Sequence, residues 1–334
     1  MRTSRGGGGR AGQRGSALLS VLWLSAALAA IAFSLAITVR GEVERSSTDI
    51  DGLRAYYLAR GGVERAALEL LWSIPQPLEK KLIRRYSTEV NYHFASGDVR
   101  VEILPEAGKL DVNREKPEVL ERLMVALGVE PGRAREIAMA IEDWRTPAPG
   151  GSPLDDYYST LIPSFQSPHA SIQEIEELLQ VKGVTPDIFY GTYIPGEPAG
   201  LGGPRPLVRR AGLADSLSVY GARGAVDANT ANPAVLAAVG VPPGVIETLL
   251  ERRKLAPFSQ DQLNGFMEAM GIGGASLRVE GNTMLTFRGT ARLRAADGRL
   301  SDLRRTVAVQ VKYMPREADT PIHYLRWYDT AWSD

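Results

Sequence analysis

The chain has 334 residues, with 39 basic and 39 acidic side chains and no cysteine. Its length is sufficient for two hydrophobic cores, and its balanced charge gives no sign of a nucleic-acid or other polyanionic partner. The lack of cysteine excludes disulfides, thiolate zinc sites and cysteine nucleophiles, and three widely separated histidines argue against a histidine-rich metal site.

The first predicted element is an apolar segment near the amino end. Residues 16–39 carry no charge, and these 24 residues exceed the roughly 20 that a helix needs to cross the bilayer core. Arg2, Arg5, Arg10 and Arg14 precede the segment without any acidic residue, a bias that keeps the amino end in the cytoplasm. The segment therefore predicts a single-pass membrane anchor.

A cleaved secretory signal is the alternative interpretation of this segment, because LSAALAAIA offers small residues for cleavage. However, the apolar run is longer than the usual stretch of roughly 7–15 residues. It also continues without a breaker into an amphipathic segment. The apolar residues of that segment are Leu53, Tyr56, Tyr57, Val63, Ala66, Ala67, Leu70 and Leu71. One long helix, half in lipid and half packed on a soluble domain, accounts for both segments, with Gly61 and Gly62 as its weak point.

Strand patterns flank a helical region in the soluble part. Alternating residues predict strands over 86–94 and 97–106, with a turn at Ser96 and Gly97. Further strands are predicted over 276–281, 283–295, 303–314 and 323–332, with a hairpin turn at 296–298. Between Asn113 and about Ala275 the pattern is mostly helical, and the Gly/Pro-rich residues 195–206 predict an exposed flexible linker.

The helical region contains an internal repeat. Residues 111–132 match residues 227–244, apart from four extra residues, about one helical turn, in the first copy. Each copy predicts a capped helix, a glycine hairpin and a second helix, which is a helix-hairpin-helix unit. Residues 172–186 and 258–273 are looser echoes of the same pattern. The matched positions include Asp111 with Asp227, Asn113 with Asn229, Pro117 with Pro233, and Leu120 with Leu236.

Helix-hairpin-helix units often bind nucleic-acid phosphates through N–H groups at a helix start. Such binding relies on nearby cations, yet residues 111–145 hold eight acids and six bases, a net charge of −2. Residues 227–270 hold five acids and three bases, again −2, and only Arg133 and Arg135 lie beside the first hairpin. We therefore expect the repeat to serve packing, and no nucleic-acid partner.

The amino end resembles that of type IV pilins and pseudopilins: a short basic leader ending in Gly15, then an apolar helix running into a soluble domain. The resemblance implies that a prepilin peptidase cuts after Gly15, and that Ser16 becomes the methylated amino terminus. Most members have Glu at the fifth mature position, where this sequence has Ser20. The branch that lacks this Glu is the large minor pseudopilin of type II secretion, general secretion pathway protein K.

Further motifs strengthen the resemblance to this branch, which runs from Gly15 almost to Trp332. EDWRT, DDYYSTL, SIQEIEELLQVKGVTPDIFYG, VDANTANPAVL and APFSQDQL occur in the order typical of the family. The resemblance implies an α+β fold: a pilin-like long N-terminal helix on an antiparallel sheet, with a large all-α insertion of helix-hairpin-helix or SAM-like type. The expected divisions are a leader at 1–15, a transmembrane half-helix at 16–39, the rest of the helix with the first strands at 40–112, the insertion at 113–275 and the last strands at 276–334.

The family resemblance also implies a calcium site in an acidic loop after the tryptophan. Here the loop reads TPAPGGSPLDDYY, so Asp155 and Asp156 are kept, but Leu154 stands where the family has Glu. Glu142 and Asp143 are upstream candidate ligands. Calcium takes roughly six to eight oxygen ligands, and the other interpretation is that Asp155 and Asp156 only cap or solvate a turn.

No residue pattern typical of catalysis occurs, so the chain is predicted not to be an enzyme. The resemblance implies a minor pseudopilin at the tip of a type II secretion pseudopilus, anchored in the bacterial inner membrane with its amino end cytoplasmic and its soluble part periplasmic. Its implied partners are the minor pseudopilins lettered I and J, the prepilin peptidase and inner-membrane lipid. The alternatives are a membrane-anchored helix-hairpin-helix DNA receptor of competence type and a secreted soluble protein.

Overall fold

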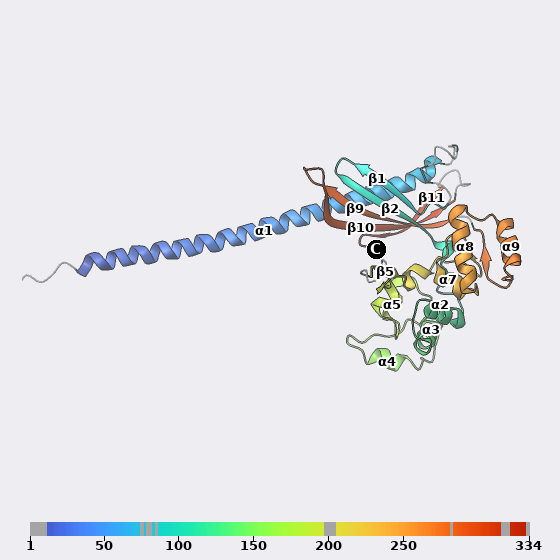
Figure 1. The fold of residues 1–334 in the computed structure, drawn as a ribbon. Helices are drawn as coiled ribbons and strands as arrows, with labels where there is room; N and C mark the ends of the chain where they lie inside the picture. Colours follow the sequence, from blue (N-terminus) through green and yellow to red (C-terminus); the bar gives the residue numbers. More distant parts are fainter. Residues whose placement is uncertain are drawn as a thin grey trace, which may run out of the picture.

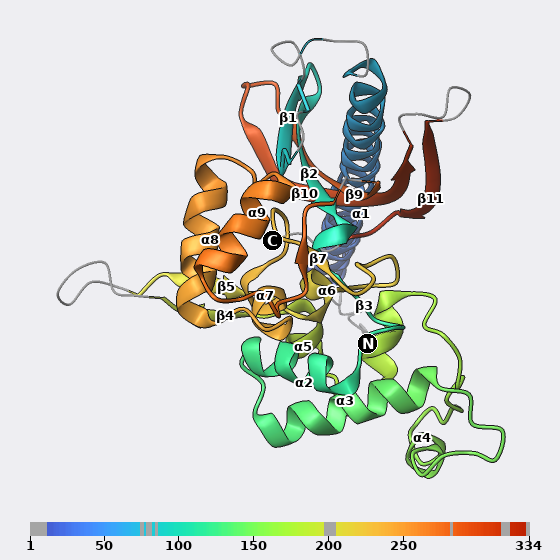
Figure 2. The same ribbon diagram turned by 90° about the vertical axis from the view of Figure 1, so that its right-hand side faces the viewer.

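The computed structural model describes residues 12–73, 77, 82–83, 86–196, 205–280, 283–314 and 321–331, with side chains from residue 18 onward. One very long helix has an amino-terminal half that contacts no other described element and a carboxyl-terminal half that lies against an antiparallel sheet (Figure 1). A helical part lies on the other side of the sheet, with α4 farthest from it (Figures 1 and 2).

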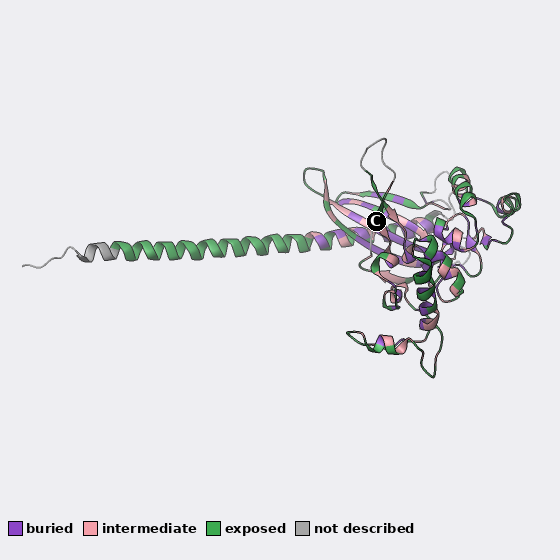
Figure 3. Ribbon diagram, turned by 60° about the horizontal axis from the view of Figure 1, so that its bottom comes forward, coloured by how far each residue is buried: buried purple, intermediate pink, exposed green. Residues whose placement is uncertain are grey.

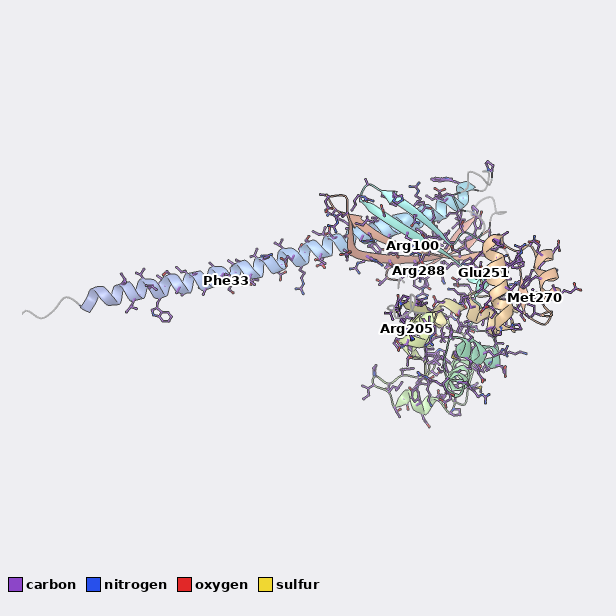
Figure 4. All side chains as sticks on the ribbon, viewed as in Figure 1. Phe33, Arg100, Arg205, Glu251, Met270 and Arg288 are labelled. Carbon is purple, nitrogen blue, oxygen red and sulfur yellow. The ribbon has the colours of Figure 1, made fainter. Side chains whose placement is uncertain are left out.

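The long helix, α1 (Gly12–Ser73), contains 62 residues and passes through Gly61 and Gly62 without a break. From Leu18 onward its amino-terminal half is exposed (Figure 3), and Phe33, with 69% exposure, points away from the helix into open space (Figure 4). Among the described residues, α1 is the one helix long and apolar enough to cross a membrane. Its most apolar window has a mean hydropathy of 2.2 and is wholly exposed.

The sheet has five antiparallel strands in the order β1-β2-β9-β10-β11. The bounds are β1 (Glu89–Phe94), β2 (Gly97–Pro105), β9 (Met284–Arg294), β10 (Leu300–Tyr313) and β11 (Ile322–Tyr328). The two predicted hairpins are confirmed, because β1 pairs with β2 and β9 pairs with β10. Strands from both ends of the soluble part therefore form one sheet, with β2 beside β9.

The helix packs on the sheet through small residues. Buried Ala59, Val63, Ala66 and Ala67 of α1 share a core with inward-facing strand residues such as Val101, Phe287 and Val309. This result corrects part of the sequence interpretation, because Leu53 and Tyr57, which were assigned to the packed face, are 57% and 60% exposed. The packed stripe follows the alanines and glycines between the larger residues.

Two glycines explain how close this packing is. A Cβ on Gly62 would lie 2.5 Å from Val99 Cγ1, and a Cβ on Gly289 of β9 would lie 2.5 Å from Val63 Cγ2 and 3.0 Å from the Ala59 carbonyl oxygen. The two 2.5 Å distances are too short for a real Cβ contact. Gly62, the expected weak point of the helix, is thus a residue that the helix–sheet contact requires.

The helical part has its own hydrophobic core, separate from that of α1 and the sheet. Its helices are α2 (Pro117–Ala126), α3 (Pro131–Arg145), α4 (Asp155–Ser159), α5 (Pro186–Tyr190), α6 (Leu213–Ser216), α7 (Pro233–Ala238), α8 (Pro243–Leu255) and α9 (Gln260–Ala269), with 3-10 turns η2 (Glu106–Gly108) and η3 (Ile175–Gln180). Two short parallel pairs join its segments: β3 (Leu110–Asp111) with β6 (Leu217–Ser218), and β7 (Val226–Asp227) with β8 (Leu277–Arg278).

Two segments differ from their sequence interpretation. The Gly/Pro-rich segment is flanked by a hairpin, since β4 (Thr192–Pro195) pairs with β5 (Leu207–Arg210), and the residues between 197 and 204 lie outside the described chain. Residues 276–281 supply β8, which pairs with β7 of the helical part and not with the five-stranded sheet. Alternation over so few residues does not reveal which partner a strand will take.

Candidate functional site

The expected cleavage site lies at the start of α1. Gly15 and Ser16 fall within its first turns, where side chains are not described, and residues 1–11 of the leader lie outside the described residues. Ser20 follows one turn later on an exposed surface. The apolar residues around it are exposed, including Leu19 and Trp23 at 60% and 75%. Cleavage and methylation remain predictions from the sequence.

The internal repeat has the same geometry in both copies. The Asp111 carboxylate accepts a hydrogen bond from the Asn113 backbone N–H at 2.9 Å, and Asp227 accepts one from Asn229 at 3.0 Å. Each asparagine side chain also donates to the backbone carbonyl and accepts from the backbone N–H of one distant residue. Asn113 pairs with Ile172 (2.8 and 2.8 Å), and Asn229 pairs with Phe258 (3.0 and 2.7 Å).

A pair of arginines, which the sequence interpretation missed, completes each unit. Arg145, at the end of α3, donates to the carbonyl oxygens of Val112 and Glu115. Arg253, near the end of α8, donates to the carbonyls of Ala228 and Ala231 at 3.0 and 2.7 Å. In each copy these carbonyls follow the repeat's aspartate by one and four positions. An arginine near the end of the second helix of both copies was the sequence signal that could have revealed this contact.

The hairpins turn on glycines in the left-handed region, with φ of 83° at Gly128 and 96° at Gly240. At the first hairpin, the backbone N–H groups at the start of α3 that could bind a phosphate already have an acceptor. The Glu130 carboxylate accepts from the backbone N–H groups of Gly132 and Arg133, both at 2.9 Å, and these bonds lower the pKa of Glu130. An anionic cap of this kind repels phosphate.

The two basic residues beside this hairpin are also engaged. Arg135 pairs with Glu121 at 3.2 Å, and Arg133 donates to the Gly183 carbonyl at 3.0 Å. The geometry of the hairpin therefore favours packing over phosphate binding, and the absence of a nucleic-acid partner remains a prediction.

The four candidate calcium ligands do not converge on one point. The carboxylate of Glu142 bonds to the Arg145 guanidinium and to the Thr146 hydroxyl. Asp143 accepts from the Ser152 hydroxyl at 3.0 Å, whereas Asp155 accepts from the Ser152 backbone N–H at 2.7 Å. Only Asp143 and Asp155 are brought into one local network.

His169 closes this network from the far side of the loop. Its Nε2 lies 2.9 Å from Asp155 Oδ1, and its Nδ1 lies 3.1 Å from the Asp143 carbonyl oxygen. The hydrogen bond to Asp155 raises the pKa of His169. The pKa of Asp155 is lowered, first by the Ser152 N–H and then by His169. Sequence reasoning missed His169 because a lone histidine gave no spacing signal.

A calcium ion does not fit this arrangement of oxygens. Both carboxylate oxygens of Asp155 already have donors, and Glu142 is held by Arg145. Within the described ranges, no three acidic or histidine side chains gather in a way that could hold a metal ion. Six to eight oxygen ligands, as calcium requires, are not assembled here.

Comparison with known proteins gives one consistent result. Residues 101–191 match the family model described as type II secretion system (T2SS), protein K. The chain is 23% identical to type II secretion system protein K of Klebsiella pneumoniae over 196 residues, 53% of this chain and 60% of that protein. Both matches are to protein K of type II secretion systems, the family that the sequence motifs resemble. The alignment thus spans about three-fifths of the length of this family member.

The fold is also similar to that of a solved structure. The structure resembles a chain in the crystal structure of the GspK-GspI-GspJ complex from the type 2 secretion system of enterotoxigenic Escherichia coli, with a TM-score of 0.57 and 15% identity. The match covers 86% of this chain and all of that one. The predicted α+β fold is confirmed: a long N-terminal helix, an antiparallel sheet and an added helical part.

Proposed function

We propose that this protein is a minor pseudopilin that occupies the tip of a type II secretion pseudopilus and helps to start its assembly. The observation that carries the proposal is the division of α1 (Figure 3). One continuous helix has a bare, apolar amino-terminal half and a carboxyl-terminal half packed on a sheet. A subunit of this shape can be anchored in a membrane by its helix and then assembled into a helical filament.

The bare half of α1 supports anchorage in the inner membrane, with the amino end cytoplasmic and the sheet and helical part periplasmic. Residues 16–39 are long enough to span the bilayer core, and arginines precede them. In this proposal a prepilin peptidase cuts after Gly15, and the helix from Ser16 onward stays with the mature protein. Inner-membrane lipid is thus the first partner of α1.

Two features support a place at the filament end. Ser20 stands where a carboxylate would neutralise the amino terminus of a neighbouring subunit in lipid, so this subunit cannot satisfy the amine of another. The helical part also extends well to one side of α1 (Figure 2), where it would crowd a subunit stacked above it. We propose pseudopilins of the I and J types as its neighbours, since the related chain is found in a complex with such proteins.

The proposal is tested by finding the protein in sheared filaments with a quantitative label. The expected result is a protein far scarcer than the major subunit and confined to filament ends. Ser20→Glu should leave secretion largely intact, because the bulk of the helical part still keeps the subunit at the tip. Regular labelling along the filament length would contradict the tip assignment.

A further inference from the structure

The loop between α3 and α4 is tied at three points by side chains that meet around Ser152. The Ser152 N–H binds Asp155 Oδ2 at 2.7 Å, and the Ser152 hydroxyl donates to Asp143 Oδ2 at 3.0 Å and accepts from the Leu154 N–H at 3.0 Å. Gly151 is in the left-handed region, with φ of 79°, which turns the chain back toward Asp155. These bonds give the loop a defined shape around two carboxylates.

His169 joins the two ends of this loop. Its ring bridges Asp155, at the start of α4, and the Asp143 carbonyl, near the end of α3, and its side chain is only 14% exposed. Both atoms that face the ring nitrogens are oxygen acceptors, so a ring that donates from both nitrogens satisfies both contacts. The adjacent Ala170 N–H bonds to the Trp144 carbonyl at 3.2 Å, which fixes the backbone beside the ring.

His169 adopts an unusual backbone conformation, with φ of 43°. Such a conformation is uncommon for residues other than glycine, and histidine and asparagine tolerate it better than most. This backbone strain occurs at the residue whose ring bridges Asp155 and Asp143, which indicates that the surrounding contacts hold the ring in place. The buried ring of Tyr158 packs edge-on against Trp144 beneath this loop, with 5.4 Å between ring centroids.

We propose that His169 closes this acidic loop in place of a metal ion, so that the loop keeps its structure without calcium. The ring supplies hydrogen-bond donors to the same carboxylate and carbonyl oxygens that a cation would draw together. A calcium ion at Asp155 would meet a carboxylate whose two oxygens each already accept a hydrogen bond, one from the Ser152 N–H and one from His169. The sequence substitution of Leu154 for the family's acidic residue agrees with this loss of ligands.

The closed loop shapes a neighbouring surface. Ala148, Pro153 and Leu154 of the loop form one wall of a groove along α3, with a volume of about 1140 Å³, and Met139 on α3 lines it and is 56% exposed. Opening the loop would therefore remove a wall of this groove.

The test is amide hydrogen exchange of peptides covering residues 146–159 in the full-length protein in detergent, with excess calcium or excess chelator. The wild-type loop should show the same protection in both conditions. His169→Asn tolerates the left-handed backbone but cannot make both bonds, so it should speed exchange in this loop about 10-fold or more, with or without calcium.

A second histidine provides the matched control. His93 lies 3.2 Å from Asp98 on the exposed sheet surface, but its side chain is 76% exposed. His93→Asn should leave exchange in the loop unchanged. Loss of wild-type protection in chelator, recovery of the His169→Asn loop by calcium, or unchanged exchange in His169→Asn would each overturn the proposal.

Discussion

The helix of the α1–sheet unit packs mainly through small residues, whereas the helical part is held together by polar side chains that bind buried backbone groups. In the first unit, Gly62 and Gly289 let helix and strand approach until no Cβ could fit. In the second, Asn113 and Asn229, with Arg145 and Arg253, bind peptide groups of distant loops. The α1–sheet unit should therefore be destabilised by larger side chains at its glycines, and the helical part by loss of these polar side chains.

The difference follows from the shapes of the two cores. A long helix on a sheet buries a continuous stripe, so its stability depends on how closely two regular surfaces meet. Short helices joined by loops leave many peptide groups without a partner inside the same element. Those groups must be satisfied by side chains, and losing one such side chain leaves several groups unsatisfied.

The largest effect is expected from filling the helix–sheet contact. Gly289→Val places a branched side chain against the Ala59 carbonyl and Val63, and should destabilise the α1–sheet unit by about 3 kcal/mol. Denaturant unfolding of the full-length protein in detergent measures this loss. Gly61→Ala is the matched control, since a Cβ there meets no atom within 4 Å.

The control substitution should not lower the free energy of unfolding. Alanine favours the helix over glycine by up to about 1 kcal/mol, so Gly61→Ala should be neutral or stabilising. Equal losses from Gly61→Ala and Gly289→Val would mean that close approach at Gly289 is not what stabilises the unit.

A smaller loss is expected in the helical part. Asn229→Ala removes two bonds to Phe258 and leaves a buried peptide group without a partner, which should cost about 2 kcal/mol. Asn113→Ala should cost a similar amount through Ile172. Hydrogen exchange should place both losses in the helical part and leave the sheet unaffected.

An exposed asparagine checks this prediction. Asn91 bonds to Glu89 on the sheet surface, and Asn91→Ala should change stability by less than about 0.5 kcal/mol. If Asn113→Ala or Asn229→Ala were as mild as this control, the repeat would not depend on its asparagines.

Protection of the closed loop from hydrogen exchange should fall at both low and high pH. The pKa of His169 is raised by Asp155, so its contribution is present below about pH 6.5 and is lost as pH rises through the raised value. The pKa of Asp155 is lowered, so its contribution is present above about pH 4 and is lost as pH falls through the lowered value. Protection of residues 146–159 should thus be greatest between about pH 4 and 6.5, and His169→Asn should abolish the decline on the alkaline side.

The smallest expected effect concerns nucleic acid. The Glu130 cap and the negative net charge of both repeat units predict no salt-dependent DNA binding at physiological ionic strength. Arg133→Ala combined with Arg135→Ala should therefore change nothing in a DNA-binding titration. A micromolar complex that this double substitution weakens would favour a DNA receptor of competence type.

Periodicity in the sequence predicted much of the fold. The long helix, both main hairpins and the repeated helical units came from apolar spacing, alternation and matched positions, because those patterns follow from which face each element buries. The same approach misplaced Leu53 and Tyr57, since hydropathy favours large residues and this contact uses small ones. Glycines carry no hydropathy signal for close packing, so Gly62 was interpreted as a weakness.

The polar contacts were harder to predict. Arg145 and Arg253 lie near helix ends, where a charged residue is usually solvated. Their positions in the two repeat copies also differ by about one helical turn, so the alignment of the repeat does not pair them. His169 lies 14 residues from Asp155 in a segment without periodicity. A pairing of that kind depends on the path of a loop, which the spacing of residues does not specify.

We expect a prepilin peptidase to cut after Gly15 and the apolar helix to stay with the mature protein. Amino-terminal sequencing of the protein from cells with an active prepilin peptidase tests this cleavage. The mature protein should begin at methylated Ser16, and Gly15→Val should leave the leader attached. A mature terminus between Ala30 and Phe33 would instead indicate an ordinary signal peptide and would contradict the pseudopilin assignment.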